Sequence, residues 1–224
     1  MNLRRNNIIH SFCEYITRLA LYSYHEIEYE GSKNIPPHGP ALLLPKHTSL
    51  KDIMLEGAFL KEQCNRYGNW VMKSGLPGMY SLLGGIKIKR PNDIKKIKDK
   101  KKRRAILEQA REFNKKTMQY LEWIYRNGEI VIVHPEGTRT VGKVNTLKKE
   151  LVDFTLEISE RYSLNIPVIP IGIEYESLGS LRSKVYLRAG NQLDIKTPNL
   201  MDIVRSEISR LSNISQPALE KNQV

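Results

Sequence analysis

The chain has 224 residues, which is enough for one domain with a sizeable core. Its 36 Lys and Arg against 24 Asp and Glu give a formal charge of +12, which favours an anionic partner: nucleic acid, anionic lipid or an acidic substrate. The two cysteines form no C-x-x-C pair, which argues against a disulfide framework or a thiolate zinc site and fits a reducing compartment.

The first segment, residues 3–23, is predicted to be an amphipathic helix. Its apolar stripe consists of Ile8, Ile9, Phe12, Ile16, Leu19, Ala20 and Ser23. Such a stripe suits either packing on the rest of the chain or docking at a membrane interface. No stretch approaches 18 uninterrupted apolar residues and none resembles a secretory signal, so neither a spanning helix nor export is expected.

Strands then alternate with helices along the chain. Strands are predicted at 24–30, 41–45, 69–73, 86–89, 129–133, 167–175 and 184–189. Helices are predicted near 50–63, 77–83, 102–126, 148–162 and 198–212. This alternation predicts an α/β fold, a mixed sheet covered by helices. We expect an N-terminal helix over 1–23, one domain over 24–213 and a frayed tail over 214–224.

His47 and Asp52 follow the apolar run at 41–44, which is predicted to be a short buried strand. Two residues five apart on one helix point about 140° away from each other, so this pair meets only if His47 precedes the helix and the loop folds back. A carboxylate would then hold one ring nitrogen protonated and leave the other free to accept a proton. The pattern therefore predicts a general base, and backbone N–H groups after His47 are candidate oxyanion donors.

Three later blocks contribute charged residues and turns. Residues 134–140, His-Pro-Glu-Gly-Thr-Arg-Thr, follow a predicted strand and suit backbone and guanidinium contacts to an anion. Residues 85–90 form an alternating strand that ends in Arg90. Residues 166–171, Ile-Pro-Val-Ile-Pro-Ile, carry two prolines, which predict an edge strand or the start of a strand.

In this order, the four blocks resemble the motifs of the lysophospholipid acyltransferases, the family that includes 1-acylglycerol-3-phosphate acyltransferase. The family's N-H-x-S-x-x-D is matched by Lys46 to Asp52, and its F-P-E-G-T-R-S by His134 to Thr140. Its G-x-[IFL]-x-[IV]-x-R is matched by the block ending at Arg90, and its V-P-[IV]-[IV]-P-V by residues 166–171. The resemblance covers roughly residues 25–195.

The resemblance implies acyl transfer from a thioester, either acyl-CoA or acyl carrier protein, to a lysophospholipid hydroxyl, with lysophosphatidate as the default acceptor. It implies no metal or further cofactor, an anionic membrane surface as partner, no nucleic acid, and a peripheral place on the cytoplasmic side of the membrane. The catalytic residues would be His47 and Asp52. The substrate-binding residues would be Lys73, Arg90, Glu136, Gly137, Thr138 and Arg139. Glu136 would orient Arg139 or bind an acceptor hydroxyl.

Four departures from the family pattern leave alternatives open. Lys46 stands where Asn is usual, His134 where an aromatic is usual, Lys87 where an apolar residue is usual, and 147–150 replace a Phe-Lys-x-Gly stretch. His134 either fills the place of the aromatic ring or is a second titrating group. The alternative functions are a membrane-surface lipid-binding protein on the same fold, or an acyltransferase acting on a different lysolipid or an amine-bearing acceptor.

The densest basic run, Lys95 to Arg104, has eight Lys or Arg in ten residues. It suits a solvated helix start, a contact with anionic lipid or, less well, a nucleic-acid contact, because no aromatic residues are interleaved with it.

Overall fold

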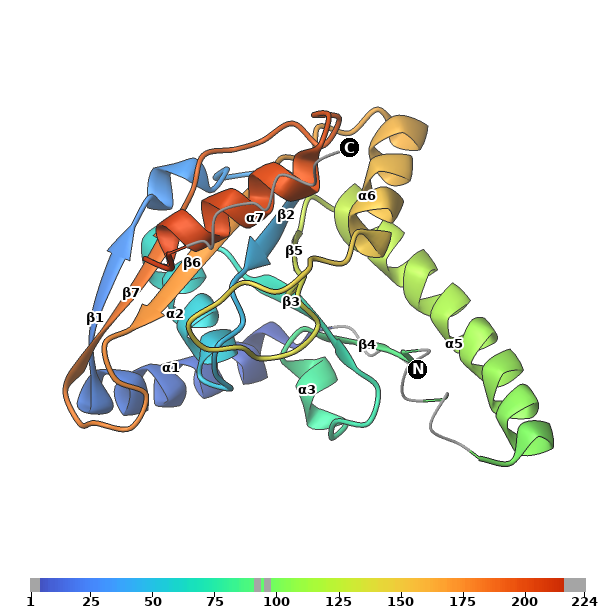
Figure 1. Ribbon diagram of the computed structural model, residues 1–224, viewed down its shortest axis with the longest axis horizontal. Helices are drawn as coiled ribbons and strands as arrows, with labels where there is room; N and C mark the ends of the chain where they lie inside the picture. The colour runs from blue at the N-terminus through green and yellow to red at the C-terminus, as the bar shows by residue number, and fades with distance from the viewer. Residues whose placement is uncertain (1–4, 91–93, 95–97, 216–224) are drawn as a thin grey trace, which may run out of the picture.

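A computed structural model of the chain describes residues 5–90, 94 and 98–215. Its centre is a seven-stranded sheet in the order β1-β7-β6-β2-β5-β3-β4 (Figure 1). The strands are β1 His25–Glu30, β2 Ala41–Pro45, β3 Gly68–Lys73, β4 Gly85–Ile88, β5 Ile130–Ile132, β6 Val168–Tyr175 and β7 Ser183–Ala189. The strands from β6 to β4 run parallel, whereas β7 runs antiparallel to β6 and parallel to β1. The predicted mixed α/β sheet is confirmed.

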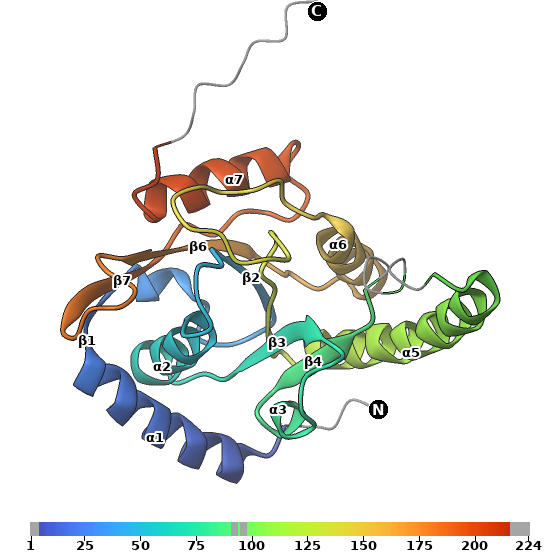
Figure 2. The ribbon, with the colours of Figure 1, turned by 60° about the horizontal axis from the view of Figure 1, so that its bottom comes forward.

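Helices cover both faces of this sheet (Figure 2). They are α1 Asn7–Tyr24, α2 Asp52–Cys64, α3 Met79–Leu82, α5 Lys100–Arg126, α6 Glu150–Tyr162 and α7 Leu200–Leu211, with a short 3-10 turn η1 at Ser32–Asn34. Each of the five helices predicted after residue 50 has a counterpart whose bounds agree within two residues. The turn η1 had no helical signal in the sequence.

The core alternates with period two along the central strand β2. Leu42 and Leu44 face the cluster built by α5, α6 and α7, whereas Ala41 and Leu43 face the cluster under α2. All four side chains are fully buried or nearly so. Because successive side chains of a strand point to opposite faces, a continuous apolar run is what a strand between two helical layers requires.

Two alternatives were predicted for residues 166–171: the edge strand is wrong, because β6 lies between β2 and β7, whereas the start of a strand is confirmed for Pro167. Pro167 does precede the strand, but Pro170 lies within it. The Pro170 carbonyl accepts a hydrogen bond from the Gly190 N–H, and Gly190 lies one residue beyond the end of β7. An N–H at Pro170 would point to the same side as this carbonyl. A proline is therefore tolerated here because no strand partner stands opposite its nitrogen.

The apolar stripe of α1 faces outward. Ile8, Phe12 and Leu19 are 83%, 64% and 55% exposed, whereas His10 and Leu21 are buried against the body. The His10 ring packs edge-on against Tyr67, which follows α2. Of the two predictions for this helix, packing on the rest of the chain therefore involves the face opposite the apolar stripe. No helix within the described ranges is both long and apolar enough to cross a bilayer.

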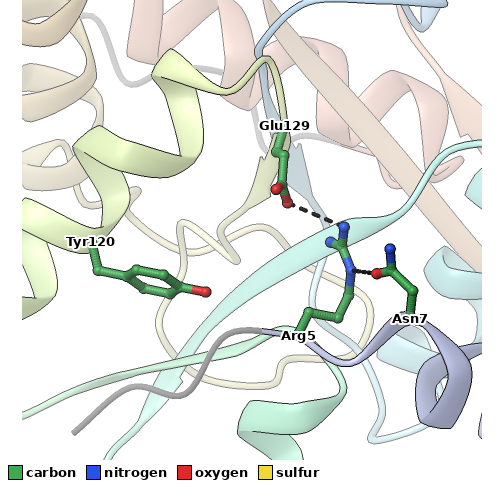
Figure 3. A pocket seen from close by; sticks show the side chains of 4 residues that line it. All are labelled: Arg5, Asn7, Tyr120 and Glu129. Carbon is green, nitrogen blue, oxygen red and sulfur yellow. Dashed lines mark hydrogen bonds and ion pairs between the residues drawn. The ribbon is translucent and has the colours of Figure 1, made fainter.

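Arg5, which precedes α1, is held by side chains near the amino ends of the parallel strands. Arg5 pairs with Glu129 at 3.2 Å and bonds to Asn7 at 3.0 Å, in a small pocket that Tyr120 also lines (Figure 3). Glu129 directly precedes β5, so this pocket lies at the amino ends of the strands. Lys95, Lys96 and Ile97 of the basic run, and residues 216–224 of the predicted tail, lie outside the described residues.

Candidate active site

The predicted site residues gather at the carboxyl ends of neighbouring parallel strands. His47 lies two residues after β2, His134 two residues after β5, and Arg90 two residues after β4. Lys73 is the last residue of β3. The order β2-β5-β3-β4 in the sheet therefore sets these side chains along a single edge.

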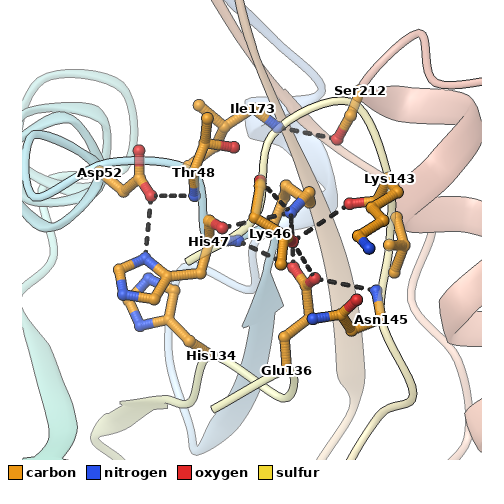
Figure 4. Close-up of polar contacts among 12 residues, drawn as sticks. Lys46, His47, Thr48, Asp52, His134, Glu136, Lys143, Asn145, Ile173 and Ser212 are labelled. Carbon is orange, nitrogen blue, oxygen red and sulfur yellow. Dashed lines mark hydrogen bonds and ion pairs between the residues drawn. The ribbon is translucent and has the colours of Figure 1, made fainter. Parts of the chain in front are cut away.

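The structure brings His47 and Asp52 together. His47 lies in the loop after β2, Asp52 opens α2, and Nδ1 of the ring donates to Oδ2 of the carboxylate at 2.9 Å (Figure 4). Asp52 is fully buried, whereas the His47 side chain is 16% exposed. Within the described residues, no hydrogen bond to His47 Nε2 is found. The pair thus presents one ring nitrogen to an incoming group and holds the other.

The carboxylate of Asp52 is held from three further directions. Oδ2 accepts the backbone N–H groups of Thr48 at 2.6 Å and Ser49 at 2.8 Å. Oδ1 accepts the hydroxyl of Tyr175 at 2.9 Å, and burial together with this neighbouring carboxylate raises the pKa of Tyr175. The expectation of oxyanion donors just after His47 is wrong for Thr48 and Ser49, because both N–H groups point at Asp52.

A buried ion pair joins the loop after β2 to the loop after β5. Lys46 Nζ lies 2.7 Å from Glu136 Oε1, and both side chains are completely buried. Lys46 also donates to the carbonyl and the hydroxyl oxygen of Thr140 at 2.8 and 2.7 Å, and the other Glu136 oxygen accepts the Asn145 N–H at 2.9 Å (Figure 4). Lys46, which stands where the family usually has asparagine, thus makes a contact inside the protein.

The two roles predicted for Glu136 are wrong. Its carboxylate has no exposed surface for an acceptor hydroxyl, and its partners are Lys46, Thr140, Asn145 and the His47 N–H rather than Arg139. Glu136 instead fixes the loop geometry around His47. Sequence separation hides this contact, because the lysine and the glutamate are 90 positions apart in the chain.

The cationic candidates lie farther along the same edge. Arg90 donates from Nη1 to the Gly137 carbonyl at 3.0 Å, which joins the second and third motifs. Gly137 has a φ of +66°, a left-handed conformation that side chains disfavour, in the turn closed by its N–H to the His134 carbonyl. Thr138 and Arg139 are exposed on this loop, and Lys73 is exposed at the end of β3.

A second histidine lies against the first. The rings of His134 and His47 stack with centroids 4.0 Å apart, and His134 Nε2 lies 2.9 Å from Glu56 Oε1. Burial lowers the pKa of His134, but the carboxylates of Glu56, Asp52 and Glu136 together more than offset this, so the net pKa lies above the usual value. Ligand atoms of His47, Asp52 and His134 lie within 4.8 Å of one another, close enough to suit a metal ion. One nitrogen of each ring is already engaged by a carboxylate, Asp52 for His47 and Glu56 for His134, so we interpret the group as an acid–base cluster.

Two residues of this cluster escaped the sequence analysis. Glu56 carried a usable signal, because it lies four residues after Asp52 and shares its helix face. Tyr175 carried none, because its hydroxyl reaches Asp52 from the end of β6, 123 residues away.

The sequence matches the family described as Acyltransferase over residues 26–174, more than half of the chain. The chain belongs to this family and is an acyltransferase. In fold it is similar to the crystal structure of the 1-acyl-sn-glycerophosphate (LPA) acyltransferase, PlsC, from Thermotoga maritima. That match has 23% identity and a TM-score of 0.60 over 90% of this chain and 77% of that chain. A search of curated proteins found no matching sequence.

Proposed function

We propose that this acyltransferase moves a fatty acyl group from a thioester donor to the hydroxyl of a lysophospholipid, with lysophosphatidate as the preferred acceptor. The observation that carries the proposal is the His47–Asp52 pair, with Nδ1 held at 2.9 Å and the His47 side chain 16% exposed. An alcohol is a weak nucleophile at neutral pH, so it needs a base to take its proton during attack.

The transfer balances without a protein nucleophile. The acceptor oxygen attacks the thioester carbonyl while Nε2 of His47 takes the hydroxyl proton. The new C–O bond forms, the C–S bond breaks, and the imidazolium returns the proton to the leaving thiolate. Asp52 keeps the ring oriented and stabilises the imidazolium, and the buried hydrogen bonds to Asp52 keep that carboxylate in place.

Lysophosphatidate is favoured because cations extend from the base along the strand ends. Arg90 and Arg139 suit bidentate contact with a phosphate, and Lys73 adds a point charge. The Arg90 contact with Gly137 holds the two cationic loops together. A phosphate bound there would leave a hydroxyl of the same molecule near His47.

The exposed stripe of α1 supports docking on an anionic membrane. In Figure 1, α1, α3 and the β6–β7 hairpin lie along the lower edge of the molecule. Exposed apolar side chains occur on all three: Phe12 on α1, Met79 on α3 at 60% and Leu181 on the hairpin at 72%. An apolar face flanked by basic residues binds the boundary between headgroups and acyl chains. The protein would then take its lipid acceptor from the surface on which it lies.

The decisive experiment is an acceptor and donor screen by mass spectrometry with purified protein on vesicles, using acyl-CoA and acyl carrier protein thioesters. His47→Ala should lower turnover by about 10²–10⁴-fold in a folded protein. Retention of most turnover by folded His47→Ala would remove His47 as the base. Binding of vesicles without transfer to any acceptor would favour a lipid-binding protein.

The phosphate assignment has its own test. Arg139→Ala and Arg90→Ala should raise the acceptor KM at saturating donor, and Arg139→Lys should restore it only in part. Arg210→Ala is the matched control, because this exposed arginine pairs with Glu207 on α7. An unchanged acceptor KM in both alanine variants would place the phosphate elsewhere.

The membrane assignment is tested by flotation of the protein with anionic vesicles. A variant with Ile8, Phe12 and Leu19 changed to Ser should lose at least about tenfold in vesicle affinity, and it should fold because these side chains are exposed. Ile203→Ser is the control, because it removes one partly exposed apolar side chain on α7, away from α1; Ile203 is 36% exposed. Deletion of residues 1–23 should behave like the triple variant. Equal flotation of all these proteins would contradict docking through α1.

A further inference from the structure

The loop after β2, which carries His47, is tied to the β6–β7 hairpin through two consecutive residues. Asp52 accepts the hydroxyl of Tyr175, the last residue of β6, at 2.9 Å. Lys51, directly before Asp52, reaches the turn of the same hairpin, where its Nζ donates to the Leu178 carbonyl at 3.2 Å. The first contact holds the carboxylate that orients His47, and the second holds the residue before it.

Lys51 also contacts two aromatic residues at the junction of α1 with β1. Its Nζ lies 3.1 Å from Nε2 of His25 and 4.1 Å from the centre of the Tyr24 ring. An ammonium has N–H donors and no acceptor, so Nε2 of His25 is the accepting nitrogen and Nδ1 carries the proton. Nδ1 then donates to Ser183, whose carbonyl and hydroxyl oxygens lie at 3.2 and 3.0 Å. His25 therefore joins Lys51 to the first residue of β7.

The partners of the Lys51 ammonium are all neutral groups. They are a ring nitrogen, a carbonyl oxygen and the face of a phenol ring, which match its three N–H groups in number. The end of α1 and the β6–β7 hairpin meet at the lower left of the molecule (Figure 1). Lys51 is thus a link among the loop after β2, the hairpin and the start of β1, rather than one half of a surface ion pair.

We propose that Lys51 and His25 are positioning residues for acyl transfer, and that their contact fixes the loop after β2 so that His47 and Asp52 keep their place relative to the bound substrates. The proposal rests on the proposed role of His47 as the base, but on no particular acceptor. His25 begins β1 and lies outside all four sequence blocks. A residue that no motif contains would therefore affect turnover.

The loop after β2 needs such a link because its outer side is open. Leu50, next to Lys51, is 66% exposed. A catalytic group has to be held within about 0.5 Å of its productive position by packing and supporting hydrogen bonds. A displacement of about 1 Å can slow a reaction on the order of 100-fold. The hairpin is a suitable support, because its strands β6 and β7 are paired within the central sheet.

The test compares wild type with Lys51→Met, His25→Phe and the double variant, on vesicles with the best acceptor and donor from the screen. Methionine keeps most of the side-chain length but has no donor. Phenylalanine keeps a ring beside Tyr24 and Tyr175 but cannot accept from the ammonium.

Lys51→Met should lower kcat roughly tenfold or more, with the acceptor KM nearly unchanged. His25→Phe should lower kcat less, about threefold or more, because Lys51 keeps its bond to Leu178. The double variant should be about as slow as Lys51→Met alone, because both changes remove the same contact.

Lys61→Met is the matched control. Lys61 lies toward the other end of α2, donates to the Asn65 side chain at 3.0 Å and lies 4.7 Å from the centre of the Tyr67 ring. It therefore has a similar set of contacts away from Asp52, and its loss should leave kcat unchanged. An unchanged m value in urea unfolding shows that each variant reaches the same folded state.

A second measurement needs no substrate. The backbone N–H groups of Thr48 and Ser49 bond to Asp52, so a loosened loop should exchange these amide hydrogens faster. Exchange in residues 47–52, followed by mass spectrometry, should be faster in Lys51→Met than in wild type and unchanged in Lys61→Met.

Wild-type kcat or wild-type exchange in folded Lys51→Met would overturn the proposal. A raised acceptor KM at unchanged kcat would overturn it as well, by making Lys51 a substrate-binding cation. Losses that multiply in the double variant would show that Lys51 and His25 do not act through their contact. A wrong acceptor assignment leaves the exchange result intact, and failure of His47 as the base would instead appear as turnover by His47→Ala.

Discussion

The buried pair of Lys46 and Glu136 makes the sharpest prediction about how the site is held. Lys46→Met removes the ammonium and leaves a carboxylate in a place with no exposed surface. Removal of one partner of a buried pair costs about 3–5 kcal/mol. Here Glu136 Oε2 keeps Thr140 and the Asn145 N–H, while Oε1 keeps only the His47 N–H at 3.3 Å. We therefore expect the low end, about 3 kcal/mol.

The assay is urea unfolding at pH 7 followed by tryptophan fluorescence, with an unchanged m value as evidence for the same folded state. For a chain of this size, a loss of about 3 kcal/mol corresponds to a fall in Tm of roughly 6–12 °C. Glu136→Gln in the Lys46→Met background should recover at least half of the loss, because the amide is neutral and still accepts from Asn145.

Lys149→Met is the matched control, because Lys149 pairs with Asp153 at 3.5 Å with the two side chains 73% and 55% exposed. An exposed pair contributes at most about 1 kcal/mol, so this variant should be nearly as stable as wild type. A Lys46→Met loss below about 1 kcal/mol, or a double variant as unstable as the sum of its two single variants, would show that the ion pair does not hold the two loops together.

Three further predictions concern single side chains. Tyr175→Phe should lower kcat about tenfold with little change in acceptor KM, since a hydrogen bond to a charged group contributes about 1.5–3 kcal/mol; an unchanged kcat would mean that Asp52 needs no hydroxyl. Gly172→Ala should cost about 1–3 kcal/mol in urea unfolding, because the added Cβ would overlap the backbone of Leu211 at the end of α7, and wild-type stability would contradict that packing. Burial lowers the pKa of His10 to about 4, so the unfolded chain binds a proton there more tightly, and stability should fall as the pH drops from about 6.5 toward 4. His10→Phe should flatten this decline in unfolding measured at several pH values, and an equally steep decline would exclude His10 as its source.

The sequence predicts the sheet well because each strand is a short apolar or alternating run. The run at Ala41–Pro45 is buried on both faces, and the alternation at Ser183–Ala189 matches a strand with one buried face. The error at β6 has a physical cause. A proline lacks a backbone N–H, so a proline within a strand suggests an edge. The sequence does not show that β7 ends at Ala189, one residue before Gly190, which lies beside Pro170.

The site was predictable where its partners are close in the chain. The spacing of His47 and Asp52 required a loop before the helix, and the structure has that loop. Glu136 was assigned to the substrate on the resemblance to the family, as a residue that orients Arg139 or binds an acceptor hydroxyl. Its actual partner, Lys46, comes from another strand end, and only the parallel pairing of β2 with β5 brings the two together.

Lys46 and His134, two of the departures from the family pattern, share one physical feature. Each is a basic residue where an uncharged one is usual, and each lies in the interior with a carboxylate as partner, Glu136 for Lys46 and Glu56 for His134. A buried cation without such a partner would be strongly destabilising, so these residues are compatible with the fold only together with their carboxylates. Both contacts also border His47, one through the loop backbone and one through the stacked ring. The departures therefore change how the His47 ring and its loop are held, and they leave His47 and Asp52 themselves in place.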